Sequence, residues 1–384
     1  MTWNDTWNIT GIQYPYNGTD FRLTRSLFID QLDTVYVSFG EDALVATWKS
    51  GNHLPAHIYK GKDVIIENWF TFASRIFNSL QGIIKNFLDL LNTMEQLDKK
   101  LNIMNSLFVL NNSDIYVSDK TDKVIRIWRS NLSKGTIVLH EDGCDAIFIN
   151  QDNYLYCSIR KKNKIVRKSL LTNTSEWDNI LSSNGNSVRT SKEQSNWPLP
   201  NFQIPSPIPS KYWNYWNELR TESTCTYDRE LAEPRGIFID HESNLYVANS
   251  QCNNILQYQL YSDGTCVFKR STSGIGGLNL SRPISIILDA NRNLYVTDTQ
   301  HNRIISIDSN WTQWRCLVGK CDHANEEHPQ LSYPISIGFD SVGSLLVSNM
   351  GNDQVLKFFL FKQQELGEFN VLVYSRNCSD ENNT

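Results

Sequence analysis

The chain repeats one pattern of apolar and polar positions six times. In each copy, a short apolar run is followed by a polar turn, a run of the Leu-Tyr-Val type, a second polar turn and a third apolar run. The copies align without gaps across their cores and occupy residues 23–48, 103–128, 143–168, 233–258, 282–307 and 333–358. Because the runs are short and rich in Ile, Val, Tyr and Phe, they predict β-strands.

Three strands per copy, repeated six times, are typical of a β-propeller. A fourth, outer strand is expected at segments such as 135–142, 264–271, 312–319 and 369–377. Residues 6–13 also have the pattern of an outer strand, so the sequence leaves open which terminal segment completes the last blade. We predict an all-β fold in which residues 1–384 form a single six-bladed β-propeller domain.

The last three copies resemble the repeats of the NHL family of β-propellers. They begin at Pro234, Pro283 and Pro334, and two of them contain Asn-Leu-Tyr-Val, starting at Asn244 and Asn293. The first three copies depart from this pattern, because their leading residues are Thr24, Met104 and Cys144. The resemblance implies a six-bladed propeller that presents one face to a protein, a glycan or RNA, and it implies no particular reaction.

Two insertions interrupt the spacing of the copies. Residues 62–102, after the first copy, have apolar side chains at steps of three and four, which predicts one long amphipathic helix. That apolar face needs cover from the propeller, a membrane surface or a second molecule, so self-association through the helix stays open. Residues 184–230, after the third copy, are rich in Pro and aromatic residues and predict a loop insertion.

Eight cysteines, all after residue 143, indicate disulfide bonds. Their spacing favours three pairs, namely Cys316 with Cys321, Cys144 with Cys157 and Cys225 with Cys252. Cys266 and Cys378 are left unassigned. Several Asn-x-Ser/Thr sequons are present as well, and the candidate glycosylation sites are Asn111, Asn131, Asn173, Asn279 and Asn310.

These features predict a secreted glycoprotein, with a cytoplasmic location as the alternative. The alternative is kept because the first residues have neither the basic nor the apolar region of a signal peptide. No run of about 18 apolar residues is present, so no membrane span is expected. The chain has 36 Lys and Arg against 41 Asp and Glu, which argues against DNA as a partner.

Candidate binding residues come from the column at the start of the innermost strands, because only these positions converge on the channel mouth. The column consists of Arg25, Asn105, Asp145, Arg235, Ile284 and Ile335. Two Arg and two Ile do not suit a metal, so we predict no metal and no cofactor. The four polar members, Arg25, Asn105, Asp145 and Arg235, suit an anionic or hydrogen-bonding group. A basic run at 160–168 is a second candidate for an anionic partner.

The column at the end of the first strand is rich in Asp, with Asp30, Asp240, Asp289 and Asp340. Short polar side chains at such positions are expected to cap hairpin turns. No motif of a phosphate-binding loop, a metalloprotease or a serine hydrolase is present. We therefore predict a non-enzymatic, extracellular binding or scaffold module whose partner is a protein or an anionic glycan. The alternatives are a propeller lyase or lactonase-type hydrolase with a central metal, and an intracellular RNA-binding or ubiquitin-pathway NHL protein.

Overall fold

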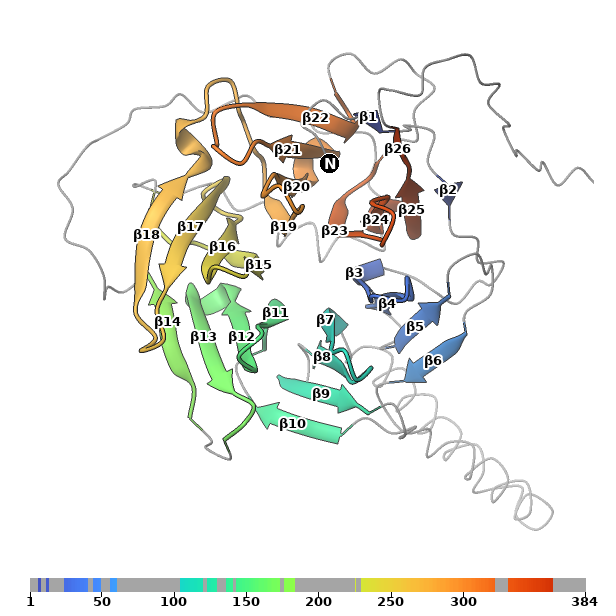
Figure 1. Ribbon diagram of the computed structural model, residues 1–384, viewed down its shortest axis with the longest axis vertical. Coiled ribbons are helices and arrows are strands. Elements are labelled where there is room, and N and C mark those ends of the chain that lie inside the picture. The colour runs from blue at the N-terminus through green and yellow to red at the C-terminus, as the bar shows by residue number, and fades with distance from the viewer. Residues whose placement is uncertain are drawn as a thin grey trace, which may run out of the picture.

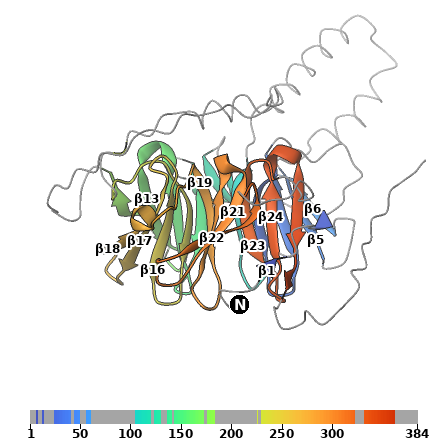
Figure 2. The ribbon, with the colours of Figure 1, turned by 90° about the horizontal axis from the view of Figure 1, so that it is seen from above.

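Six four-stranded antiparallel sheets stand radially around a central channel in the computed structural model (Figure 1). Figure 2 shows the same blades from the side. The protein is an all-β, six-bladed β-propeller. The residues that the structure describes are 6–7, 12–13, 24–40, 44–49, 56–60, 104–119, 123–129, 136–140, 143–172, 176–183, 225, 229–321 and 331–361.

Each of the first five blades is a meander that runs from the channel outward. Blade one consists of β3 (Thr24–Ile29), β4 (Val35–Phe39), β5 (Leu44–Trp48) and β6 (His57–Lys60). Blade two consists of β7 (Met104–Val109), β8 (Ile115–Asp119), β9 (Val124–Trp128) and β10 (Thr136–His140). Blade three consists of β11 (Ala146–Ile149), β12 (Tyr154–Ile159), β13 (Lys164–Ser169) and β14 (Asp178–Ser182).

Blades four and five follow the same plan. Blade four consists of β15 (Pro234–Ile239), β16 (Asn244–Asn249), β17 (Asn254–Leu260) and β18 (Cys266–Ser271). Blade five consists of β19 (Pro283–Leu288), β20 (Leu294–Asp298), β21 (Arg303–Ile307) and β22 (Trp314–Gly319). The described helical segments are single 3-10 turns, η1 (Arg160–Lys162), η3 (Thr272–Gly274), η4 (Thr299–His301) and η5 (Met350–Asn352).

The N-terminal segment completes the last blade. Blade six contains β23 (Pro334–Phe339), β24 (Leu345–Asn349) and β25 (Gln354–Phe358), and its outer strand is β2 (Ile12–Gln13). Beside it, β1 (Thr6–Trp7) pairs with β26 (Leu360–Phe361). This pairing answers the question that the sequence left open. The competing segment, 369–377, lies outside the described residues.

Hydrogen bonds between the first and last blades strengthen the closure of the ring. Near the channel, the backbone N–H of Leu27 donates to Oγ of Ser336 at 2.9 Å. At the far end of the inner strands, the N–H and hydroxyl of Ser341 donate to the carboxylate of Asp33 at 2.7 and 2.6 Å. Residues more than 300 positions apart in the chain thus hold the ring together.

The hydrophobic core lies between neighbouring blades. One cluster combines Tyr156 and Ile165 of blade three with Leu245 and Val247 of blade four, all fully or almost fully buried. The second strand of a blade is covered on both faces, as in β4 and β20, where every residue is buried. This explains why these second strands begin with three consecutive apolar residues, 35–37 in β4 and 294–296 in β20, instead of an alternating pattern.

The Asp residues at the ends of the inner strands cap hairpin turns, as the sequence predicted. In blade four, Oδ1 of Asp240 accepts the backbone N–H groups of Glu242 and Asn244 at 3.0 and 2.8 Å. Asp30, Asp289 and Asp340 accept the corresponding pairs in their own blades. The other carboxylate oxygen of Asp240 accepts the hydroxyl of Tyr246 at 3.1 Å. These carboxylates are thus used within the turns.

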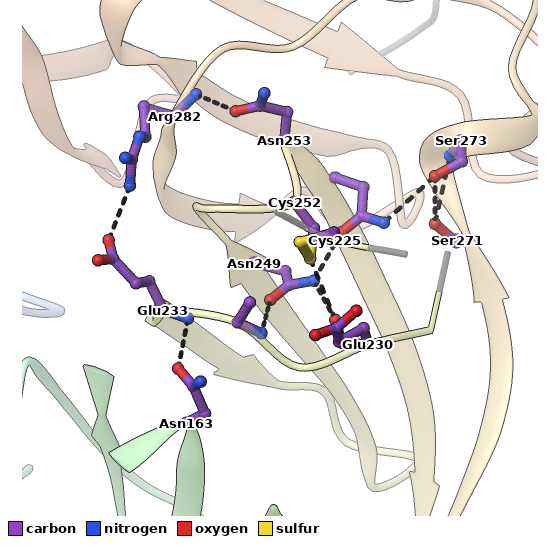
Figure 3. Close-up of a disulfide and its surroundings, with 12 residues drawn as sticks. Asn163, Cys225, Glu230, Glu233, Asn249, Cys252, Asn253, Ser271, Ser273 and Arg282 are labelled. Carbon is purple, nitrogen blue, oxygen red and sulfur yellow. Dashed lines mark hydrogen bonds and ion pairs between the residues drawn. A yellow bond between two sulfur atoms is a disulfide. The ribbon is translucent and has the colours of Figure 1, made fainter. Parts of the chain in front are cut away.

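Asparagine side chains connect three successive pairs of blades. Figure 3 shows two of these contacts, those of Asn163 and Asn253. Each of the three asparagines has a positive φ, between 47° and 56°, in the turn that follows the second strand. Each accepts the backbone N–H of the residue just before the next inner strand, at 2.8 to 2.9 Å. The pairs are Asn163 with Glu233, Asn253 with Arg282 and Asn302 with Tyr333. Asn suits this position because it tolerates the left-handed region and has a short acceptor side chain.

The described residues contain three disulfides, and they are the pairs that the spacing favoured. They join Cys144 to Cys157, Cys225 to Cys252 and Cys316 to Cys321, with Cα atoms 5.4 to 5.8 Å apart. Three disulfides indicate an oxidising environment. No described helix has the length and apolar character needed to cross a membrane.

Cys266 is the free cysteine of the described residues, and we expect it to resist alkylation in the folded protein. Its thiol is buried, and burial raises its pKa to about 12. Because the thiolate is the reactive form, iodoacetamide should modify Cys266 only after the protein is unfolded. Peptide mapping without reduction checks this and should also recover the three linked peptide pairs. Free thiols at those six cysteines would contradict the disulfides and the oxidising environment together.

Both predicted insertions fall outside the described residues, apart from Cys225, Arg229 and Glu230 at the end of the second one. The long helix predicted at 62–102 therefore has no support from any described helix. The Pro-rich loop predicted at 184–230 likewise remains a prediction. Cys378 and the sequons at Asn131 and Asn173 also lie outside the described residues.

Candidate functional site

Five of the six inner strands begin with a β-bulge, and three of these bulges contain a predicted site residue, namely Arg25, Asn105 or Arg235. In β3, the pairing with β4 shifts register between Thr24 and Ser26, so Arg25 lies in the bulge. In β15, the shift lies between Pro234 and Ile237 and includes Arg235. The inner strands β7, β19 and β23 have similar shifts. A bulged residue leaves the regular ladder and can direct its side chain away from it.

Small residues follow the bulged column and allow the inner strands to approach one another. The positions are Ser26, Ser106, Ala146, Gly236, Ser285 and Ser336. Three of the hydroxyls join neighbouring blades, because Ser336, Ser26 and Ser106 accept the N–H groups of Leu27, Leu107 and Ile147 at 2.9, 3.2 and 3.1 Å. At Gly236, an added Cβ would lie only 2.2 Å from the carbonyl oxygen of Ile284.

A cavity of about 80 Å³ lies at this mouth. Residues from all six inner strands line it, and Asp145, which directly precedes β11, lines it as well. Its charged lining residues are Arg25, Asp145 and Arg235. Ile284 and Ile335 form its apolar part. The structure thus brings three of the four predicted site residues together. The side chain of the fourth, Asn105, is outside the described part of the chain.

Aromatic rings replace the polar residues further along the inner strands. Phe28, Phe108, Phe148 and Phe238 come from four consecutive blades, and neighbouring ring centroids are 5.1 to 5.4 Å apart. Such spacing is that of edge or tilted aromatic contacts. The described polar lining is therefore concentrated at the mouth of the channel.

Asp145 has a partner that the sequence analysis did not connect with the site. The backbone N–H of Arg160, which begins η1, donates to Oδ2 of Asp145 at 3.0 Å. The Nε atom of Arg160 lies 3.4 Å from the other carboxylate oxygen. Arg160 belongs to the basic run 160–168, but only 3% of it is exposed. Its charge is thus part of the channel mouth.

The rest of the basic run is only partly available to a ligand. Arg167 is buried, binds Asp178 at 3.2 Å and stacks on Tyr154. Lys168 is buried as well, whereas Lys161 and Lys162 are exposed. The structure therefore does not support the whole run as one anionic binding surface.

Glu233 and Arg282 extend the site between blades four and five (Figure 3). Nη1 of Arg282 donates to Oε2 of Glu233 at 2.7 Å, and Nη1 of Arg160 lies 3.8 Å from the same oxygen. Burial lowers the pKa of Arg282, as do the nearby charges of Arg235 and Arg160, while Glu233 raises it. Both residues directly precede a leading proline, which was the signal that sequence analysis could have used.

The described mouth has more positive than negative charge. Four guanidinium groups, from Arg25, Arg160, Arg235 and Arg282, are set against the carboxylates of Asp145 and Glu233. All four arginines are less than 10% exposed. In a partly desolvated site, an excess of guanidinium groups favours an anion.

A central metal does not fit the side chains that are described at this mouth. Asp145 and Glu233 are both engaged by arginines. Across the described residues, no three side chains of His, Cys, Asp or Glu gather as a metal site would require. The arrangement can instead bind an anion and can present a carboxylate beside it.

At the level of sequence, no family model and no curated protein matches the chain. Solved structures give the fold. A gluconolactonase from Xanthomonas campestris is 9% identical, covers 88% of this chain and 86% of its own, and has a TM-score of 0.54. An auxiliary nutrient binding protein from Bacteroides thetaiotaomicron is 9% identical, covers 92% and 72%, and has a TM-score of 0.56. A virginiamycin B lyase from Staphylococcus aureus is 14% identical, covers 90% and 83%, and has a TM-score of 0.48.

These comparisons contradict the prediction that this protein is not an enzyme. The prediction used the lack of familiar motifs and of a metal-binding column as evidence against catalysis. Yet similar structures include a gluconolactonase as well as a nutrient binding protein. At 9% identity the likeness concerns the fold alone, and this fold accommodates both catalysis and binding.

Proposed function

We propose that this protein binds a small anionic ligand, or an anionic group of a protein or glycan, at the channel mouth. The observation that carries the proposal is the cavity that Arg25, Asp145 and Arg235 line, together with two further buried guanidinium groups that contact Asp145 and Glu233 beside it. Arg25, Asp145 and Arg235 are the contact residues, and Asn105 is their counterpart in blade two. Arg160 and Arg282 hold the two carboxylates and add to the positive potential.

Membership of the NHL family is part of the proposal. Its support is the leading proline at the start of β15, β19 and β23 and the left-handed asparagines that join these blades. Secretion and glycosylation are proposed on the three disulfides and on the exposure of Asn111, Asn279 and Asn310. The single-domain organisation and self-association through residues 62–102 are retained as proposals.

A second candidate function is turnover of a lactone or a related substrate in the same cavity. Its support is that Asp145 and Arg235 line one cavity. A carboxylate can accept a proton from water, and a guanidinium can stabilise the oxyanion that develops on the attacked carbonyl. Hydrolysis of a lactone also yields a carboxylate, an anion that the arginines at the channel mouth can bind. Proton release from a panel of lactones, compared between the wild type and Asp145→Asn, tests this candidate.

The double variant Arg25→Ala/Arg235→Ala should abolish ligand capture and lower the melting temperature by no more than a few degrees. The physical reason is that both side chains line the cavity, and neither lies in a core cluster between blades. Capture of carboxylates and sulfated oligosaccharides is measured by calorimetry, and folding by thermal unfolding.

The matched control replaces two exposed cations of the basic run, Lys161→Ala/Lys162→Ala. This control should bind as the wild type does. If the double arginine variant still captures ligand and the lysine variant does not, the binding site lies on the basic run and the channel mouth is the wrong place.

A further inference from the structure

We propose that one edge of the Arg235 guanidinium is a preformed fork for an oxyanion, whose two oxygens it binds in bidentate fashion. The chemical class is an oxyanion with two adjacent oxygens, as in a carboxylate, a sulfate or a phosphate. This inference rests on the proposed function, and it goes further by naming the recognised group and the donor atoms.

The fork consists of two buried donor atoms with no acceptor. Arg235 is only 6% exposed and lines the cavity. Its Nε and Nη2 atoms are both inaccessible to solvent, and neither has a hydrogen-bond partner in the described part of the chain. Nε and Nη2 form the same edge of the planar guanidinium, so their N–H bonds point in parallel. That is the geometry with which arginine binds two oxygens of one anion.

Several other buried arginines of this protein bind carboxylates. The Nε–H of Arg303 donates to Asp298 at 2.7 Å, and those of Arg126 and Arg167 lie 3.2 Å from Asp119 and Asp178. Arg282 donates to Glu233 at 2.7 Å. Arg235 differs from them because it lines a cavity and its Nε and Nη2 atoms have no acceptor among the described residues. A buried, charged donor without an acceptor is costly and rare, so it requires a reason such as a ligand.

The surroundings of Arg235 increase the advantage of an anion. Arg235 lies close enough to Arg282 to lower the pKa of that neighbour, as Arg160 does. The guanidinium groups of Arg160, Arg235 and Arg282 are all buried and repel one another. Glu233 contacts two of them, Arg160 and Arg282. An oxyanion on the fork would offset this repulsion and satisfy both donors. Gly236 and Ser285 line the same cavity as Arg235.

The decisive variants are Arg235→Lys, which keeps the charge but loses the fork, and Arg235→Met, which removes the charge at similar length. The full-length protein is titrated with acetate, sulfate and phosphate at constant ionic strength, by calorimetry and by thermal unfolding. We expect Arg235→Lys to weaken oxyanion binding by about 10- to 100-fold, the effect of losing charge-assisted hydrogen bonds. We expect Arg235→Met to lose the response to oxyanions and to melt, without added anion, at or above the temperature of the wild type.

A matched control is Arg292→Lys. Arg292 lies in the turn between β19 and β20, at the opposite end of the inner strands, where it binds Glu242 and Asp240. This variant should respond to oxyanions as the wild type does. A response to acetate alone would assign the fork to carboxylates, and a stronger response to sulfate or phosphate would assign it to tetrahedral anions.

Two results would overturn the fork. One is an oxyanion affinity that Arg235→Lys leaves unchanged, and the other is a lower melting temperature of Arg235→Met without added anion. The proposed function fails in a different way, namely when no anion binds the wild type at all. If anions bind and Arg25→Ala abolishes binding while Arg235→Lys does not, the function stands and the fork is wrong.

Discussion

Replacing Gly236 with alanine should destabilise the propeller by about 3 kcal/mol or more, as overpacking against rigid groups does. Gly236 lies in the bulge of β15, and its added Cβ would be 2.2 Å from the carbonyl oxygen of Ile284 and 3.1 Å from Cα of Ser285. Both contacts are backbone atoms of the neighbouring inner strand, β19, so no side chain can rotate away. Relief would require blades four and five to separate. Urea unfolding measures the free energy of unfolding of the two proteins.

The matched control for this substitution is Gly276→Ala. No heavy atom lies within 4 Å of the Cβ that it would add, and Gly276 is not among the glycines with positive φ. Its free energy of unfolding should stay within about 0.5 kcal/mol of the wild type. Equal stability of Gly236→Ala and Gly276→Ala would mean that the inner strands are not in close contact at Gly236.

Replacing Asp298 with alanine should cost about 3 to 5 kcal/mol, as breaking a buried ion pair does. Asp298 is fully buried at the end of β20. It accepts the backbone N–H of Ser281 at 2.6 Å, Nε of Arg303 at 2.7 Å and Nδ1 of His301 at 2.8 Å. The alanine variant would leave the mostly buried charge of Arg303 without its carboxylate. Chemical unfolding gives the loss of stability.

Blade four provides the design of a compensating double variant. Asn249 and Asn254 occupy the positions of Asp298 and Arg303 there, and their side chains bond at 2.9 Å. Asn249 also accepts the backbone N–H of Ala232, as Asp298 accepts that of Ser281. Asp298→Asn/Arg303→Asn should therefore be more stable than Asp298→Ala by about 1 to 2 kcal/mol. If Asp298→Asn/Arg303→Asn is less stable than Asp298→Ala, the neutral Asn pair of blade four cannot replace the ion pair of blade five.

The sequence predicted the ring of blades well because the inner three strands of a blade are buried in the same way each time. Strands such as β4 and β20 are covered on both faces, so they begin with three consecutive apolar residues. Closure was not predictable from such patterns, because β2 has only two residues and the rival segment near the C-terminus reads equally well. Pairing of β2 with β25 is a contact between distant parts of the chain, which no local pattern encodes.

The site was predictable as far as the alignment of repeats reaches. Arg25, Asp145 and Arg235 were found because equivalent positions of different blades must converge at the channel. Arg160 was missed because it lies in a turn, where a sequence does not show which charges become buried. Glu233 is partly buried, and aligning the position before the leading prolines could have found it. The sequence offered the basic run as a separate candidate for an anionic partner, whereas the contact of Arg160 with Asp145 depends on how η1 folds back over the start of β11.

The closing strand has a consequence for the order in which the protein can fold. Residues 12–13 are synthesised long before their partner strand, β25, which ends at Phe358. The bond from Leu27 to Ser336 likewise spans 309 positions. Such non-local contacts form slowly, because the entropy of a long loop is lost before any contact is gained. During translation, the N-terminal strand therefore cannot pair until β25 has been synthesised. Deletion of the first 13 residues would destabilise blade six, which is the last of the six blades to be made.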